Sequence, residues 1–305
     1  MSAPAAYTLT RRRTLQALAL AGGAWAGMAH AQPGARRVVA LGGSITEVVY
    51  ALGAQAQLVA TDTTSLFPEA AQRTPKVGYL RQLAAEGLLA LRPDAVVGTS
   101  DAGPPVVLEH LRSAGVRVEL VHADHTWDEV RRKIETVGAV LGRPEAAHAL
   151  WQQVDAEWTA VRRHVAQARH RPRVLFILSH TGTPQVAGTG TAAHALIGFA
   201  GGVPALSGFE GYRPMTAEAL ARAAPDVVLC TTQGMEALGG ADRLWQRPEL
   251  LLTPAYARRA LVALDANHLL GFGPRLPGAV REVHQRLQTL ATSAQAAPSR
   301  PGTYA

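Results

Sequence analysis

The chain has 305 residues, of which 48% are hydrophobic and 17% are charged, and its formal net charge is +7. Its Lys and Arg residues are scattered and form no basic stripe interleaved with aromatic residues, which argues against nucleic acid as a partner. The single cysteine, Cys230, excludes a fold held by internal disulfides, and its apolar surroundings predict an ordinary buried thiol.

Residues 1–31 are typical of a signal peptide. Three arginines, Arg11 to Arg13, precede an apolar run over residues 17–28, and Ala29-His30-Ala31 has the small-x-small pattern of a cleavage site. The paired arginines resemble a twin-arginine signal, although Thr14 stands where such signals often carry Phe. The run is shorter than the roughly 20 residues of a membrane-spanning helix, and no cysteine follows it for lipid attachment. We therefore expect a soluble protein that is exported to the periplasm.

The next part of the chain alternates apolar strands with helical stretches. The apolar run Arg37–Leu41 ends at two glycines, and apolar residues then recur at helical spacing from Thr46 to Leu52. Further apolar runs follow at residues 58–60, 95–97 and 116–121. Strands that alternate with helices indicate a parallel α/β sheet, so residues 32–143 are predicted to form an N-terminal α/β lobe.

A long helix is predicted over residues 144–170, because no Gly or Pro interrupts the chain from Glu145 to His170 and its apolar residues recur every three or four positions. The α/β pattern restarts with the strand Arg173–Leu178 and continues to a last helix near residues 278–290. This pattern predicts a C-terminal α/β lobe over residues 171–290, which the long helix joins to the first lobe. Residues 291–305, with Ser, Pro, Gly and Thr, are expected to be a disordered tail.

Two segments of the predicted lobes resemble each other. Tyr79-Leu80-Arg81 leads through an Ala-Glu pair to Pro93-Asp94 and an apolar strand, and Tyr212-Arg213 leads through another Ala-Glu pair to Pro225-Asp226 and an apolar strand. Pro-Asp before a buried strand is common by itself, but the matching order favours two similar Rossmann-like lobes with parallel sheets. Ligands of open α/β sheets bind outside the strand ends, so the ligand site is expected in the cleft between the lobes.

Four motifs carry a family resemblance: residues 41–53, residues 77–87 with their Val-Gly-Tyr-x-Arg start, residues 211–214 and residues 270–275. Together they resemble the periplasmic haem-binding proteins of haem-uptake ABC transporters, whose scaffold also includes vitamin B12 and siderophore carriers. The resemblance covers nearly all of the chain after residue 31. It implies a monomeric binding protein, and not an enzyme, that delivers ferric haem b to an ABC permease and its ATPase in the inner membrane for iron uptake.

The resemblance also implies an iron ligand. In that family the Tyr of the Val-Gly-Tyr-x-Arg segment is the axial ligand of the haem iron, and here it falls on Tyr79. A phenolate is a hard anionic donor that suits ferric iron, and tyrosine ligates haem in catalase. A phenol needs a nearby cation to ionise at neutral pH, which Arg81 could supply. The alternative is that Tyr79 is an ordinary amphipathic residue at the start of a helix.

Four further residues are candidates for the haem pocket. His180, after the strand 173–178, is either a second iron ligand or a polar loop residue. Tyr212 and Arg213, the second-lobe counterparts of the Tyr–Arg pair, could cover the porphyrin face and pair with a propionate. Arg275 either contacts the ligand or anchors the Gly-Phe-Gly-Pro turn before it.

Glu69 and Glu210 are candidates for docking on the permease, because in relatives of this scaffold acidic residues on both lobes meet permease arginines. Most surface acids are simply solvated, which is the alternative for both.

Two other functions are considered. A corrinoid or ferric-siderophore carrier would use the same scaffold without a phenolate ligand. A periplasmic enzyme is less favoured, because Gly42-Gly43-Ser44 lacks the later glycine of a nucleophile elbow and His122 to His125 has no companion metal ligands. The start of a dinucleotide motif at Gly188 lacks an acidic residue at a strand end.

Overall fold

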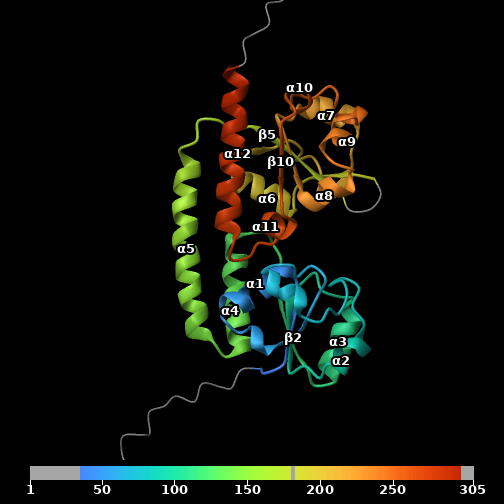
Figure 1. Ribbon diagram of the computed structural model, residues 1–305, viewed down its shortest axis with the longest axis vertical. Helices are drawn as coiled ribbons and strands as arrows, with labels where there is room; N and C mark the ends of the chain where they lie inside the picture. The colour runs from blue at the N-terminus through green and yellow to red at the C-terminus, as the bar shows by residue number, and fades with distance from the viewer. Residues whose placement is uncertain (1–34, 180–182, 297–305) are drawn as a thin grey trace, which may run out of the picture. The chain divides into compact units, whose positions relative to one another are not determined.

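The computed structural model describes residues 35–179 and 183–296. The predicted signal peptide and His180 lie outside these residues. The described chain forms two α/β lobes connected by one long helix, α5 (Pro144–Ala166; Figure 1). Among the described helices, none is long and apolar enough to cross a membrane.

The first lobe has a four-stranded parallel sheet in the order β2-β1-β3-β4. Val38 and Ala40 of β1 face a core cluster shared with α1 and α4, whereas Val39 and Leu41 face a second cluster shared with α2 and α3. A parallel sheet is buried on both faces, which is why its strands are continuous apolar runs. The elements are β1 (Val38–Leu41), α1 (Gly43–Ala51), β2 (Leu58–Thr61), α2 (Ala85–Ala90), β3 (Ala95–Thr99), α3 (Pro105–Ser113), β4 (Arg117–Val121) and α4 (Trp127–Leu141), with short 3₁₀ turns at Gln55–Gln57 and Glu69–Arg73.

The second lobe has a six-stranded sheet in the order β10-β9-β5-β6-β8, with β7 paired to β5. The sheet is mixed and not wholly parallel as expected, because β6 runs antiparallel to both β5 and β8. The connection from β5 to β6 is too short for the crossover that a parallel pair requires. The elements are β5 (Arg173–Leu178), β6 (Gln185–Ala187), α6 (Ala192–Phe199), β7 (Val203–Pro204), β8 (Tyr212–Pro214), α7 (Ala217–Ala223), β9 (Val227–Thr231), α8 (Thr232–Ala237), α9 (Ala241–Trp245), α10 (Pro254–Arg258), β10 (Leu261–Leu264) and α11 (Ala266–Leu270), with a 3₁₀ turn at Pro248–Leu250.

Two long helices, α5 (Pro144–Ala166) and α12 (Leu276–Ala296), lie side by side, and α5 extends along both lobes whereas α12 lies beside the second (Figure 1). Helix α5 starts where the sequence predicts and ends four residues earlier. Helix α12 continues beyond residue 290, so the disordered tail expected from Ala291 is wrong for residues 291–296. This stretch contains Thr and Ser but no Gly or Pro, and the first helix-breaking residue is Pro298.

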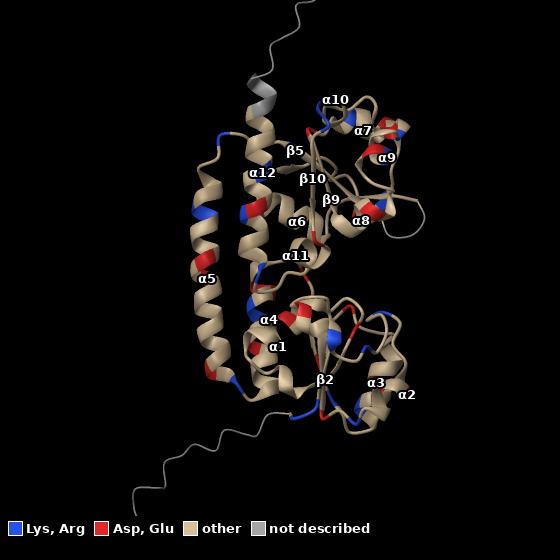
Figure 2. Cartoon of the chain, viewed as in Figure 1, with Lys and Arg blue, Asp and Glu red and all other residues tan. Residues whose placement is uncertain are grey.

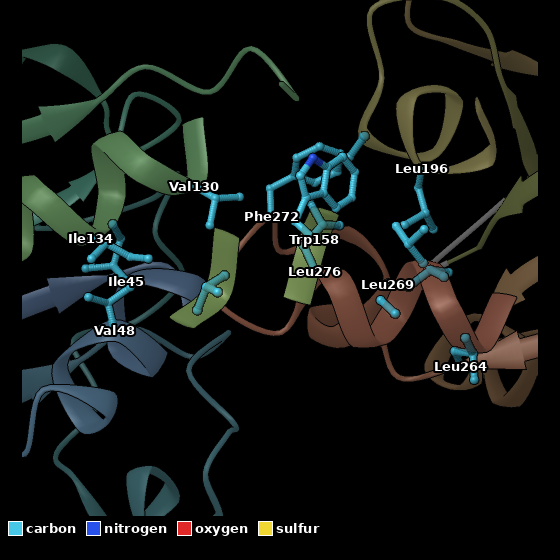
Figure 3. Close-up of a cluster of buried hydrophobic side chains, with 14 of the residues drawn as sticks. Ile45, Val48, Val130, Ile134, Trp158, Leu196, Leu264, Leu269, Phe272 and Leu276 are labelled. Carbon is cyan, nitrogen blue, oxygen red and sulfur yellow. The ribbon is translucent and has the colours of Figure 1, made fainter. Parts of the chain in front are cut away.

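One core cluster is continuous between the lobes (Figure 3). It joins residues of α1 and α4 in the first lobe to residues of α6, α11 and α12 in the second. Trp127 of α4 stacks on Trp158 of α5 with ring centroids 4.4 Å apart, and Trp158 meets Phe199 of α6 edge-on at 5.0 Å. Because this packed aromatic chain crosses from one lobe to the other, we expect only small movements between the lobes.

The repeated Pro-Asp segments have equivalent roles in the two lobes. Asp94 accepts hydrogen bonds from the N–H groups of Arg36 and Arg37 at 2.9 Å, immediately before β1. Asp226 accepts one from the N–H of Arg173 at 2.9 Å, at the first residue of β5. The tyrosine segments are not equivalent, because Tyr79 lies in a loop whereas Tyr212 begins strand β8.

Candidate functional site

A cavity of about 460 Å³ lies between the two lobes. This volume falls within the range of about 300–1,000 Å³ that is usual for small-molecule sites. The first lobe contributes the start of α1, the loop at residues 79–81 and the ends of β3 and β4. The second contributes the end of β5 and residues 190–192, 211–212, 266–267 and 270–271. The lining therefore comes largely from the carboxyl ends of strands and the helix starts that follow them, as expected for an open α/β sheet.

Tyr79 lies on the first-lobe wall of the cavity in a chain of three polar side chains. The Tyr79 hydroxyl oxygen accepts a hydrogen bond from Arg81 Nη1 at 2.7 Å, and Arg81 Nη2 donates to Asp101 Oδ2 at 2.8 Å. Partial burial favours a lower pKa for Arg81, but the hydrogen bonds and charges of Tyr79 and Asp101 outweigh burial and raise the pKa. The tyrosine is 38% exposed, so a cation lies beside a phenol oxygen on an accessible ring.

Tyr212 lies on the second-lobe wall of the same cavity. Burial raises the pKa of Tyr212, although a hydrogen bond with Thr191 and the charge of Arg81 partly oppose that shift. Neighbouring residues of a strand point to opposite faces, and Arg213 accordingly does not line the cavity. Its guanidinium instead lies over the ring of Phe209, 4.8 Å from the centroid.

Arg275 lies outside the cavity lining and makes an ion pair between the lobes. Its Nε donates to Glu47 Oε2 at 3.0 Å and its Nη2 donates to Glu47 Oε1 at 2.5 Å. The guanidinium also lies 3.6 Å from the centroid of the Phe67 ring. Burial raises the pKa of Glu47, against the opposing effect of Arg275. This geometry matches the anchoring role for Arg275, since its guanidinium ties the turn before α12 to α1.

A second buried ion pair, which the sequence did not reveal, lies in the lining of the cavity. Lys133 of α4 contacts Glu129 Oε1 at 2.6 Å and donates to the carbonyl oxygens of Gly271 and Phe272 at 2.9 and 3.0 Å. Burial lowers the pKa of Lys133, and the Glu129 carboxylate opposes that shift. Figure 2 shows acidic and basic segments close together where α1, α4 and the start of α12 meet. The sequence pattern that could have predicted this ion pair is a Glu and a Lys four residues apart on the buried face of α4.

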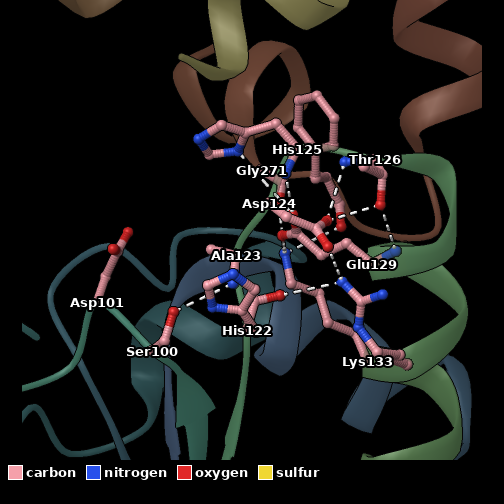
Figure 4. Close-up of polar contacts among 12 residues, drawn as sticks. Ser100, Asp101, His122, Ala123, Asp124, His125, Thr126, Glu129, Lys133 and Gly271 are labelled. Atoms are coloured by element: carbon pink, nitrogen blue, oxygen red, sulfur yellow. Dashed lines mark hydrogen bonds and ion pairs between the residues drawn. The ribbon is translucent and has the colours of Figure 1, made fainter. Parts of the chain in front are cut away.

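The loop after β4 is held by local hydrogen bonds (Figure 4). Asp124 accepts hydrogen bonds from Thr126 and Arg132, and the N–H of His125 donates to Glu129 Oε2 at 2.6 Å. The His125 ring packs on Phe272. Burial is the main cause that lowers the pKa of His125. No group of three or more His, Cys, Asp or Glu side chains suited to a metal ion occurs in the part of the chain that the structure describes.

The two candidates for permease docking lie at the surface, and the single cysteine lies in the core. Glu69 is exposed at the start of the 3₁₀ turn Glu69–Arg73, and Glu210 is exposed beside Gly190 at the cavity edge. Cys230 is fully buried in β9, and burial raises the pKa of its thiol to about 12, as expected for an inert thiol.

Asn267 is a further cavity residue that sequence reasoning missed. Its Nδ2 donates to the carbonyl oxygen of Thr64 in the other lobe at 2.5 Å. The two residues are 203 positions apart, so no local pattern could have joined them.

Several solved structures are similar to this chain. The periplasmic heme-binding protein BhuT in complex with two hemes is 46% identical, with a TM-score of 0.80, and the alignment covers 83% of this chain and 98% of that one. The periplasmic heme-binding protein RhuT from Roseiflexus sp. RS-1 is 38% identical, with a TM-score of 0.81 and coverage of 85% and 100%. A periplasmic heme-binding protein from Pseudomonas aeruginosa is 37% identical, with a TM-score of 0.74 and coverage of 84% and 93%.

Curated relatives are more distant. The ABC transporter substrate-binding lipoprotein YvrC of Bacillus subtilis (strain 168) is 23% identical over 83% of this chain and 80% of its own length. The vitamin B12-binding protein of Yersinia pestis (strain Pestoides F) is 28% identical over 143 residues, which are 47% of this chain and half of that protein. These relatives and structural neighbours are binding proteins and not enzymes. Residues 38–268 match the family model described as periplasmic binding protein, so the chain belongs to the periplasmic binding protein family.

Proposed function

We propose that this protein captures ferric haem in the cleft between its lobes, with the Tyr79 phenolate as an axial ligand of the iron, and delivers it to an ABC permease and its ATPase. The observation that carries the proposal is the hydrogen bond from the Arg81 guanidinium to the Tyr79 oxygen on an accessible cavity wall. The similarity to heme-binding proteins over most of the chain supports haem as the ligand. A signal peptide at residues 1–31 would bring the protein to the periplasm.

The two cavity tyrosines differ in their suitability as iron ligands. A ligand to ferric iron must lose its proton and reach the metal. Tyr79 is partly exposed, and its oxygen already accepts a hydrogen bond from a cation. Tyr212 is more enclosed, and burial raises the pKa of its hydroxyl, which disfavours the phenolate. We therefore assign the iron to Tyr79 and a covering role over the macrocycle to the Tyr212 ring.

The test is a titration of the purified protein with ferric haem, followed by visible absorption. A defined Soret band with the charge-transfer bands of high-spin, phenolate-ligated iron is expected. Absence of binding at micromolar haem would refute the proposal. Cobalamin and a ferric siderophore serve as competitors, because the relatives include a vitamin B12-binding protein. Tight binding of either one without haem binding would favour the alternative carrier function.

Delivery is proposed to use Glu69 and Glu210, one on each lobe, as contacts for permease arginines. Both are exposed, and Glu210 lies at the cavity edge, where a docked permease would receive the ligand. The test is haem uptake into permease-containing vesicles by Glu69→Ala/Glu210→Ala protein that binds haem normally. A matched control replaces Glu86 and Glu218, which are exposed acids of α2 and α7. Loss of uptake in the first variant alone is expected, and undiminished uptake would rule the pair out.

A further inference from the structure

The start of helix α1 presents unpaired hydrogen-bond donors to the cavity. Gly42, Gly43 and Ser44 all line it, and α1 has no side-chain cap and no acidic residue in its first turn. The Gly42 N–H donates to Asp62 Oδ1 at 2.8 Å. Among residues 35–179 and 183–296, no hydrogen bond uses the N–H of Gly43, the N–H of Ser44 or the Ser44 hydroxyl.

The residues that carry these donors are buried in the cavity wall, so water or a ligand in the cavity is the partner that can reach them. Ser44 is only 4% exposed and Gly43 is also buried. Buried N–H groups and hydroxyls are nearly always hydrogen-bonded, and a buried helix start without partners requires water or a ligand. The partial positive charge at the start of a helix favours an anion there. Two N–H groups and one hydroxyl thus form a donor set without an acceptor at the cavity wall.

The carboxylates around this donor set already have partners, which leaves room for an anion. The buried Asp62 carboxylate accepts from the N–H of Gly42 and from the hydroxyls of Thr64 and Ser65. The two carboxylates of the cavity lining, Asp101 and Glu129, are each paired with a cation of the lining, Arg81 and Lys133. The amide of Asn267 lies against Gly43, since a Cβ atom added there would lie 2.7 Å from both its Nδ2 and its Oδ1. One N–H of Nδ2 donates to the carbonyl oxygen of Thr64, and the second N–H is a neutral donor from the opposite lobe.

We propose that the start of α1 is a carboxylate subsite, at which Gly43, Ser44 and Asn267 bind a propionate of the tetrapyrrole in the cleft. This inference rests on the proposed haem function and extends it, because it assigns recognition of the ligand's acidic edge to neutral donors. Arg213 and Arg275, the arginines expected for that role, lie outside the cavity lining. Neutral donors at a helix start can hold a carboxylate without an arginine.

The test compares ferric haem with its dimethyl ester, in which both propionates are uncharged, for the wild type and Ser44→Ala. Loss of a hydrogen bond to a charged group weakens binding by about tenfold or more. Ser44→Ala is expected to weaken haem binding by about this factor and ester binding by clearly less, because an ester carbonyl accepts a hydrogen bond but carries no charge. The control is Ser113→Ala, which removes an exposed hydroxyl at the end of α3 and should change neither affinity.

The outcomes separate this inference from the haem proposal. Equal weakening of haem and ester binding in Ser44→Ala, or no weakening of either, would overturn the subsite. Ester binding near the wild-type value with intact phenolate bands shows that the variant is folded, so a clearly larger loss for haem supports the subsite. If the wild type binds neither ligand, the haem function itself fails, which is a distinct result.

Discussion

Replacement of Lys133 by Met should destabilise the protein strongly. The Lys133 ammonium contacts Glu129 Oε1 at 2.6 Å and the carbonyl oxygens of Gly271 and Phe272 at 2.9 and 3.0 Å, and the two charged side chains are 2% and 1% exposed. Methionine preserves most of the side-chain volume but leaves a buried carboxylate without its cation. Two carbonyl oxygens of the opposite lobe also lose a donor.

Breaking a buried ion pair from one side costs about 3–5 kcal/mol of the free energy of unfolding. At about 2–4 °C for each kcal/mol, the melting temperature should fall by about 6–20 °C. Circular dichroism during thermal and urea unfolding measures both quantities. The double variant Glu129→Gln/Lys133→Met removes both charges and should recover part of the loss.

Helix α4 offers a matched control, because Arg131 and Glu135 form an ion pair with the same four-residue spacing at the surface. The two side chains are 51% and 50% exposed. An exposed pair of this kind contributes about 0.3–0.5 kcal/mol, so Arg131→Met should lower the melting temperature by only about 1–2 °C. If Lys133→Met costs no more than Arg131→Met, the buried ion pair and the hydrogen bonds of Lys133 to the second lobe do not stabilise the fold as expected.

Three further predictions concern the site and its supports. Arg81→Ala should raise the pH at which phenolate bands appear in the haem complex, whereas Arg213→Ala should not. If that pH is the same in Arg81→Ala as in the wild type, Arg81 does not stabilise the phenolate. Gly188→Ala should lower the free energy of unfolding by about 2–3 kcal/mol, because the added Cβ would meet the backbone carbonyl oxygen of Phe209. The control Gly198→Ala adds a Cβ in open space and should leave urea unfolding nearly unchanged. Burial raises the pKa of Glu47 above 4.5, so the folded state binds the Glu47 proton more tightly than the unfolded state does. The free energy of unfolding of the wild type should therefore fall, relative to that of Glu47→Gln, as the pH rises above 4.5. A difference between the two proteins that stays constant with pH would contradict this.

The sequence predicted the elements whose pattern is long or strongly apolar. Strands β1, β3 and β5 are continuous apolar runs buried on both sides, and α5 has uninterrupted helical periodicity, so burial and local preference agree. Strands β6 and β8 were not predicted, because three residues carry no measurable period. The antiparallel pairing of β6 with β5 is set by a short connection and not by composition.

The site was predictable in part. Tyr79, Arg81 and Tyr212 lie in the cavity lining, as their place in the repeated segments indicated. Arg213 was misplaced because the segments were treated as equivalent, whereas β8 turns alternate residues to opposite faces. The carboxylate partners of Arg81 and Arg275 could not be read from the sequence, since Asp101 and Glu47 are 20 and 228 residues away. Such pairings depend on tertiary contact alone.

The most direct test of the central proposal compares the haem spectra of the wild type, Tyr79→Phe and Tyr212→Phe. Each variant removes one hydroxyl from a cavity-facing ring, so both should remain folded by circular dichroism. The phenolate charge-transfer bands should persist in the wild type and in Tyr212→Phe, and they should vanish in Tyr79→Phe with weaker haem binding. Phenolate bands that remain in Tyr79→Phe, or that disappear only in Tyr212→Phe, would show that Tyr79 is not the iron ligand.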